Sequence, residues 1–271
     1  MIDLKNLTFN YDSVMKFLPP LRRIEISLPS VMSLYIEMFF DDLCLGNGTG
    51  FLCKGKSGNP YLITNRHIVT GRDQETDKCL DKKTLAIPNL LRITHNKTGS
   101  LGQTIVTQEP LYNLDQYPLW VEHPHLKGRA DFVAVPVTQL DDVNLFFYEL
   151  NSQPDIKIRV SDVVSVVGFP FGKKIEGTAV WSTGFVASEP DMNYENLPIF
   201  LIDCRSRKGQ SGSAVIAHRH DGSYSDSRGN QIFGGGVVTK FLGIYSGRIN
   251  DESDLGKVWK STAVNELLNV I

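Results

Sequence analysis

The chain is poor in cysteine and has neither a long apolar run nor a surplus of charge of one sign. Its four cysteines are scattered among 271 residues without the CxxC spacing of a structural zinc site. The longest apolar stretch, residues 31–40, is too short to cross a bilayer and contains Glu37. A formal net charge of -2 argues against a broad basic surface. We therefore expect neither a nucleic-acid partner nor a membrane partner.

The first residues also lack the features of an export signal. No basic segment runs into an apolar segment there, so we expect no secretory leader. A protein that stays in the cytoplasm keeps its thiols reduced, which fits the scattered cysteines. Cys44 and Cys53 are near each other in sequence, but the sequence does not establish a disulfide between them. The expected location is cytoplasmic.

Short apolar segments separated by turn residues fill most of the sequence. Residues 34–40 alternate at period two, and we expect the Gly46-Asn47-Gly48 segment to mark the end of that strand. Residues 256–271 carry apolar side chains near helical spacing and predict a C-terminal helix. Many short strands and one terminal helix predict an all-β fold of barrels or sandwiches. Further strands are predicted at 49–53, 61–65, 90–94, 103–108, 119–122, 132–137, 163–167, 178–187, 198–204, 213–217 and 241–247.

The pattern divides the chain into three parts. Residues 1–30 are expected to form an N-terminal extension that packs on the body, with a short helix at 13–18. Residues 31–145 hold the first group of strands, and residues 146–271 hold the second group and the C-terminal helix. Residues 138–160 carry few strand signals and are the candidate linker.

A serine between two glycines follows one of the predicted strands. In the segment KGQSGSAV, Gly209 and Gly212 allow the backbone to bend closely around Ser211. A serine hydroxyl is a poor nucleophile unless a base takes its proton and donors stabilise the oxyanion that forms. By itself this segment is equally consistent with a simple Gly/Ser hairpin turn.

Two upstream segments supply the groups that such a serine needs. His67 follows an apolar strand in LITNRHIVTG, and Asp131 precedes one in ADFVAV. His67 can act as the base for Ser211, and Asp131 can hold the imidazole in the required tautomer. The backbone N–H groups of Gly209 and Ser211 can form the oxyanion hole.

In this order of His, Asp and Ser the chain resembles the chymotrypsin/trypsin-like serine peptidases, and within them the bacterial trypsin-like, HtrA-type branch. The resemblance covers roughly residues 33–250. It implies two six-stranded antiparallel β-barrels with the triad in the cleft between them. It also implies that His67 and Asp131 come from the first barrel and Ser211 from the second. The matching segments are GTGFL (48–52), LITNRHIV (62–69), Ala130-Asp131, GFPFG (168–172) and GQSGS (209–213).

The sequence also departs from that family pattern. No Ile-Val-Gly-Gly activation terminus appears, and Gln210 stands where zymogens have the aspartate that binds such a terminus, so we expect no proteolytic activation. Ser213 replaces the more usual glycine. Residues 251–271 are too few for a PDZ domain, so the full HtrA architecture is not implied.

The resemblance also suggests residues that bind substrate. Tyr245, Ser246 and Gly247 are expected to pair with the substrate backbone. Arg205 and Ser206 are expected near the base of the primary pocket, where Arg205 would disfavour a basic substrate side chain. The alternative is that Arg205 and its basic neighbours at 207 and 208 point to solvent.

These observations predict a bacterial, cytoplasmic serine endopeptidase that acts on protein or peptide substrates through an acyl-enzyme at Ser211. It needs no cofactor and no metal, because the histidine pairs at 123/125 and 218/220 lack a carboxylate or cysteine cluster. Control is expected from a regulatory protein partner, from the N-terminal arm or from a malformed oxyanion loop. The alternatives are a non-catalytic peptide- or partner-binding module on a protease fold, and an esterase that uses the same triad.

Overall fold

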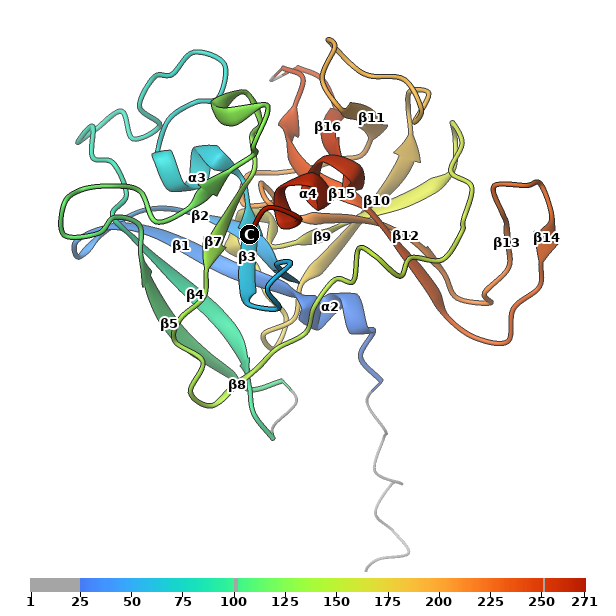
Figure 1. The fold of residues 1–271 in the computed structure, drawn as a ribbon, viewed down its shortest axis with the longest axis horizontal. Helices are drawn as coiled ribbons and strands as arrows, with labels where there is room; N and C mark the ends of the chain where they lie inside the picture. Colours follow the sequence, from blue (N-terminus) through green and yellow to red (C-terminus); the bar gives the residue numbers. More distant parts are fainter. Residues whose placement is uncertain (1–24, 100–101, 251) are drawn as a thin grey trace, which may run out of the picture.

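The computed structural model describes residues 25–99, 102–250 and 252–271, and the helix predicted at 13–18 lies outside them. Antiparallel strands make up most of the described chain, in two halves that lie side by side (Figure 1). Across the same residues, no helix has the length and apolar character needed to span a bilayer. The all-β fold class predicted from the sequence is confirmed.

The first half is an eight-stranded sheet. Seven strands follow the path β5-β4-β1-β2-β3-β7-β6, and β8 pairs with β4. The resemblance implied a six-stranded barrel here, and the structure instead adds the short strands β6 and β8 at the periphery. The strands are β1 (Ser33–Phe40), β2 (Leu43–Lys54), β3 (Pro60–Thr64), β4 (Leu90–Lys97), β5 (Thr104–Pro110), β6 (Val121–Glu122), β7 (Val133–Pro136) and β8 (Val143–Asn144).

The second half is a closed six-stranded barrel in the order β10-β11-β16-β15-β12-β9, as the resemblance implied. A small hairpin projects from it, formed by β13 (Tyr224–Ser225) and β14 (Gln231–Ile232) (Figure 1). The barrel strands are β9 (Val163–Gly168), β10 (Val180–Val186), β11 (Ile199–Asp203), β12 (Ala214–Arg219), β15 (Val238–Arg248) and β16 (Leu255–Lys260).

The strand β16 corrects the predicted C-terminal helix. Residues 256–260 were assigned to that helix, but they pair with both β11 and β15 and so close the barrel. The helix α4 covers only Ser261–Leu268. Val258 is β-branched and Trp259 is aromatic, and both residue types favour a strand. Pairing with β11 and β15 decides between the helical and the strand periodicity of this segment.

A second correction concerns the glycines at 46–48. They were expected to end a strand, yet β2 runs through them and pairs with β1 over its length. A Cβ added at Gly48 would lie 2.4 Å from Cδ1 of Ile68, and one at Gly46 would lie 2.8 Å from Cε of Met38. These glycines therefore allow close packing over the strand and do not make a turn.

Side-chain alternation along the strands divides the apolar residues between separate clusters. In β2, Leu52 faces a cluster inside the first half, while Phe51 and Cys53 face a second cluster between the two halves. The second cluster also contains Trp259 from β16 and Leu267 from α4. A third cluster fills the interior of the barrel. This second cluster fixes the position of one half relative to the other, and therefore the position of the two sides of the cleft.

The N-terminal end of the described chain packs on both halves, and most of the extension predicted at 1–30 lies outside the described residues. A short helix, α2 (Leu28–Met32), buries most of its residues. Asn96 of β4 donates to the carbonyl of Val31 (2.7 Å), and the indole of Trp181 in β10 donates to Oγ of Ser30 (2.8 Å). The boundaries predicted at 30/31 and 145/146 stay predictions.

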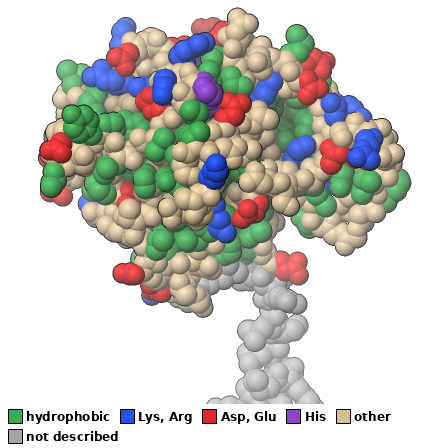
Figure 2. All heavy atoms as spheres, in the orientation of Figure 1, with side chains coloured by type: hydrophobic (Ala, Val, Ile, Leu, Met, Phe, Trp, Pro, Cys, Tyr) green, Lys and Arg blue, Asp and Glu red, His purple; other side chains and the backbone are tan. Residues whose placement is uncertain are grey.

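Acidic and basic side chains are interspersed on the face shown in Figure 2, without a broad region of one sign. This arrangement agrees with the near balance of 28 basic and 30 acidic residues in the sequence. On this face, electrostatic effects therefore arise from individual pairs and not from a large uniform field.

The register of α4 can be tested with two of its aliphatic residues. Leu267 is fully buried between the halves, whereas Val270 is 59% exposed just after the helix. We expect Leu267→Ala to lower the free energy of unfolding by about 2–5 kcal/mol, because it leaves a cavity. Val270→Ala should change it by less than about 0.5 kcal/mol. Equilibrium urea unfolding measures both, and equal effects would contradict this register.

Candidate active site

His67 lies in a short helix that follows a strand of the first sheet. The helix α3 (Arg66–Thr70) begins after β3 and ends at Gly71, whose φ of 63° suits glycine. Asp131 precedes β7 and is buried. Because β3 and β7 pair side by side, the two residues are brought together at one end of the sheet.

The imidazole of His67 is held by Asp131. Its Nδ1 lies 2.8 Å from Oδ2 and 3.0 Å from Oδ1 of that carboxylate, and its backbone N–H donates to Oδ1 at 3.0 Å. The side chain of Asn65 donates to the carbonyl oxygen of Asp131 (2.6 Å). The contact favours the tautomer with the proton on Nδ1, which leaves Nε2 to accept a proton.

Opposing effects set the pKa of His67. Burial lowers this pKa, whereas the charge of Asp131 and its hydrogen bond raise it. Asp73 also raises the pKa, and Lys257 lowers it. The net result is a pKa above the ordinary value of histidine. An imidazole held in this way by a carboxylate is suited to accept a proton from a serine hydroxyl.

The turn around Ser211 depends on its two glycines. Gly209 has φ 93° and Gly212 has φ 85°, both in the region that favours glycine. A Cβ at Gly209 would lie 2.4 Å from the carbonyl oxygen of Phe169, and one at Gly212 would lie 1.9 Å from that of Thr49. The tight backbone therefore fixes where Ser211 is presented.

Gln210 anchors this turn from within. Its side chain is fully buried, with Oε1 accepting from the backbone N–H of Arg207 (2.7 Å). Its Nε2 donates to Oγ of Ser182 on β10 (2.8 Å). A neutral amide thus holds the turn, and no new N-terminal ammonium is needed to hold it.

Two backbone N–H groups in the turn have no protein acceptor. Within the described chain, the N–H groups of Gly209 and Ser211 make no hydrogen bond, whereas the N–H of Gln210 donates to Arg207 (3.2 Å). Unpaired donors on either side of the same residue are what an oxyanion hole requires. Gly209 and Ser211 are the residues predicted to form an oxyanion hole, and that role stays a prediction.

Thr49 of the first half binds the serine turn of the second half. Its N–H donates to the carbonyl of Ser211 (2.8 Å), and its Oγ1 donates to the carbonyl of Gly209 (2.8 Å). Oγ1 also accepts from the N–H of Phe169 (3.1 Å). Thr49 is fully buried, so water does not compete for these bonds.

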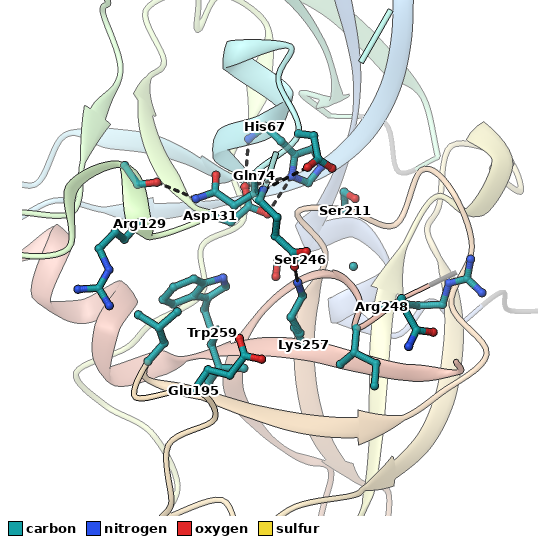
Figure 3. Close-up of a pocket in the computed structure, with 18 of the residues that line it drawn as sticks. His67, Gln74, Arg129, Asp131, Glu195, Ser211, Ser246, Arg248, Lys257 and Trp259 are labelled. Atoms are coloured by element: carbon teal, nitrogen blue, oxygen red, sulfur yellow. Dashed lines mark hydrogen bonds and ion pairs between the residues drawn. The ribbon is translucent and has the colours of Figure 1, made fainter. Parts of the chain in front are cut away.

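A cavity of about 750 Å³ is lined by His67, Asp131 and Ser211 (Figure 3). Within the residues that the structure describes, no hydrogen bond joins Ser211 to His67. Such a bond is often long in a protease without substrate and shortens in the complex. The three residues predicted as a triad are therefore brought to one cavity.

The residues predicted to bind substrate divide into two groups. Ser246 and Gly247 line the cavity, and their pairing with a substrate backbone stays a prediction. Tyr245 and Ser206 are buried and hydrogen bonded to each other through their hydroxyls, and burial raises the pKa of Tyr245 to about 12. Arg205 is exposed and does not line the cavity.

Sequence reasoning missed several charged residues of the cavity. Lys257 on β16 forms an ion pair with Glu75, which comes from the loop after α3, at 2.5 Å. Asp73 of the same loop and Trp259 of β16 also line the cavity. Lys257 was missed because its segment was assigned to a helix, and alternation in LGKVWK was the signal that could have placed it on the face of Trp259.

The two histidine pairs have structural partners. Nδ1 of His123 accepts from the backbone N–H groups of His125 and Leu126 (3.2 Å each). Nδ1 of His218 lies 2.8 Å from Oγ1 of Thr239. Among the described residues, no group of three or more His, Cys, Asp or Glu side chains could hold a metal ion.

Comparison with known proteins gives the family. The model of the trypsin-like peptidase domain matches residues 48–222. A serine endoprotease from Yersinia pestis shares the fold with a TM-score of 0.50 at 13% identity, over 90% of this chain and 66% of that chain. The active form of the Rv3671c protease from M. tuberculosis has a TM-score of 0.49 and 15% identity, over 89% of this chain and 80% of that chain. A search of the curated proteins finds no match.

The family match includes His67, Asp131 and Ser211 and covers more than half of the chain. The closed barrel, the eight-stranded sheet and the cavity between them agree with that match. The chain therefore belongs to the trypsin-like peptidase family and is a serine endopeptidase.

Proposed function

We propose that the chain hydrolyses peptide bonds through a triad of Ser211, His67 and Asp131 and a covalent acyl-enzyme. The observation that carries this proposal is the Asp131-bound imidazole in the same cavity as a serine flanked by two unpaired N–H groups. Each member supplies a function that a serine nucleophile requires.

The proposed reaction has two halves. Oγ of Ser211 attacks the substrate carbonyl while Nε2 of His67 takes the hydroxyl proton, and the N–H groups of Gly209 and Ser211 bind the oxyanion. The C–N bond then breaks as His67 returns the proton to the leaving amine. Water repeats the sequence on the acyl-enzyme and releases the acid. Asp131 stays ionised and stabilises the imidazolium throughout.

We also propose that the enzyme works in the cytoplasm and is restrained there by a protein partner or by the N-terminal arm. The four cysteines are all free thiols, which supports a reducing compartment. The serine turn is already anchored by Gln210 and keeps its two donors unpaired, so a malformed oxyanion loop is the least supported of the three predicted forms of control.

Labelling with a fluorophosphonate probe tests the nucleophile. The activated oxygen of Ser211 displaces fluoride and forms a P–O bond, so the parent protein should gain the mass of the probe. Ser211→Ala and His67→Ala should not be labelled, because each removes one partner of the proton transfer. Intact-protein mass spectrometry measures the adduct.

The matched control for this labelling is Ser213→Ala, two residues along the same turn. The hydroxyl of Ser213 is buried and has no hydrogen-bond partner in the described chain, so this variant should label like the parent. Labelling that survives in Ser211→Ala would assign the nucleophile elsewhere and contradict the proposal.

The pH dependence of labelling tests the electrostatics of His67. Reactivity needs neutral His67 and should fall as pH drops through its pKa. Asp73 raises this pKa, so Asp73→Asn should move the acidic limb to lower pH; Lys257 lowers it, so Lys257→Met should move the limb to higher pH. The measurement is the rate constant of inactivation by the probe from about pH 5 to 9. Shifts in the same direction would show that these charges do not act on His67.

Restraint by a partner has a separate test. The isolated chain should cleave casein slowly, and an extract of the native cell inactivated for its own proteases should raise the rate several-fold if a partner relieves the restraint. Ser211→Ala with the same extract is the control for residual extract activity. Rapid cleavage by the isolated chain, with no increase in rate on adding the extract, would show that no partner restrains the enzyme.

A further inference from the structure

The floor of the cavity contains a cation and an unpaired indole donor on one strand. Lys257 and Trp259 are two residues apart on β16, so their side chains project from the same face. Figure 3 shows them side by side below His67 and Ser246, with the indole nitrogen on the side of the ring that faces Lys257. Both residues line the cavity.

The indole donor lacks an acceptor. Trp259 is 2% exposed, and its Nε1 has no hydrogen-bond partner among the described residues. Buried N–H groups are nearly always paired, and an exception next to a cavity indicates a place for an acceptor from a ligand. Together with the adjacent ammonium of Lys257, it favours an acceptor that carries negative charge.

A carboxylate already occupies the position next to Lys257. Glu75 reaches it across the cleft from the first half and forms the ion pair with Nζ. The side chain of Lys257 is only 18% exposed, whereas that of Glu75 is 67% exposed. A solvent-exposed carboxylate can leave at small cost, while the half-buried ammonium needs a replacement anion.

The loop around Glu75 is organised so that this side chain faces the cleft. Oδ1 of Asp73 accepts from the backbone N–H groups of Glu75 (3.2 Å) and Thr76 (2.8 Å). Gln74 donates to the carbonyl of Gly128 (2.7 Å), which lies in the 3-10 helix Lys127–Arg129 before Asp131. Glu75 can therefore exchange its carboxylate for another without the loop losing its own bonds.

A peptide substrate can pass directly over Lys257. Ser246 and Gly247 of β15 have no pairing partner in β16, because the register shifts between Tyr245 and Arg248. An extended peptide can pair with this free backbone by strand addition. Since Ser246 lies beside both Ser211 and Lys257 in the cavity, substrate residues near the scissile bond lie within reach of Nζ.

We propose that Lys257 and Trp259 form a subsite for an acidic substrate side chain on the N-terminal side of the scissile bond, and that Glu75 occupies this subsite in the free protein. This inference rests on the proposed peptidase function of the same cleft. Apart from the Lys257–Glu75 pair and the His67–Asp131 pair, the charges that line the cavity are balanced, with Arg129 and Arg248 against Asp73 and Glu195. The preference therefore arises locally, at the ammonium that already binds a carboxylate.

The subsite also explains a form of substrate selection. A peptide with an aspartate or glutamate at this position replaces Glu75 and keeps Lys257 paired. A peptide without one either leaves the cleft crossed by the ion pair or breaks it and leaves a half-buried charge without a partner. Acidic substrates are therefore favoured over neutral ones for two reasons. Their carboxylate is attracted to Lys257, and a neutral substrate that displaces Glu75 leaves Lys257 without a partner.

Cleavage-site profiling tests the subsite. The protein is incubated with a peptide library made from a digested proteome, and cleavage sites are read by mass spectrometry for the parent, Lys257→Met and Glu75→Gln. The parent should prefer Asp or Glu at one position before the scissile bond. Lys257→Met should lose that preference by roughly tenfold, because a hydrogen bond to a charged group is lost. Glu75→Gln should raise kcat/KM for acidic peptides several-fold, because the internal competitor is removed.

A charge swap gives the sharpest outcome. The double variant Glu75→Lys with Lys257→Glu keeps an ion pair across the cleft, so a purely structural role of that pair would leave the preference unchanged. The proposal expects the preferred side chain at that position to change from acidic to basic. An unchanged profile in the double variant would overturn the subsite.

Two controls separate this inference from the proposed function. Lys97→Met removes the cation of an exposed pair between β4 and Asp142, the residue before β8, and should leave the profile unaltered. Fluorophosphonate labelling of every variant reports the nucleophile without a peptide. If every variant is labelled but the parent shows no preference for acidic peptides, the subsite alone is refuted. If the parent is not labelled, the triad is refuted.

Discussion

The whole site depends on the hydrogen bonds of one buried threonine between the halves. His67 and Asp131 belong to the first sheet, and the serine turn belongs to the barrel, so the proposed triad requires a fixed relation between the two halves. Thr49 provides it, because it bonds to the carbonyls on both sides of Gln210 and to the N–H of Phe169. Thr64 in turn donates to the carbonyl of Thr49 (2.8 Å) from the strand that leads to His67. A shift of either half would therefore break several bonds at once, in a region that water cannot reach.

The charge distribution of the cleft follows from the same division. His67 lies between two carboxylates from its own half, Asp131 and Asp73, and one ammonium from the other half, Lys257. The first half therefore favours the imidazolium and the second half opposes it. Because Lys257 pairs with Glu75, the opposition is weakened as long as that pair is intact.

How far the sequence predicts this structure depends on how local each signal is. The serine turn, the strand before His67 and the small residue before Asp131 are each specified by a few neighbouring residues, so their types and order could be read directly. The glycines at 46–48 misled because a glycine needed for packing under Ile68 looks the same in sequence as one needed for a turn. The segment 256–260 misled because it is short and adjoins a helix, and only pairing with β11 and β15 decides that it is a strand. The pairing of Lys257 with Glu75 joins residues 182 apart, and no local pattern predicts such a contact.

The proposed oxyanion donors and the ion pair that restricts access to them belong to different parts of this site. The donors at Gly209 and Ser211 are in place before substrate arrives, because Gln210 and Thr49 hold the turn in the unliganded protein. The hydroxyl of Ser211 and the imidazole of His67 are not yet bonded, and an ion pair crosses the cleft beside them. The proposed oxyanion donors therefore belong to the rigid turn, whereas the ion pair beside them is formed by side chains that a ligand can displace. Under the proposed subsite, selection among substrates rests on the exchange of one carboxylate for another at Lys257, with the backbone around Ser211 unchanged.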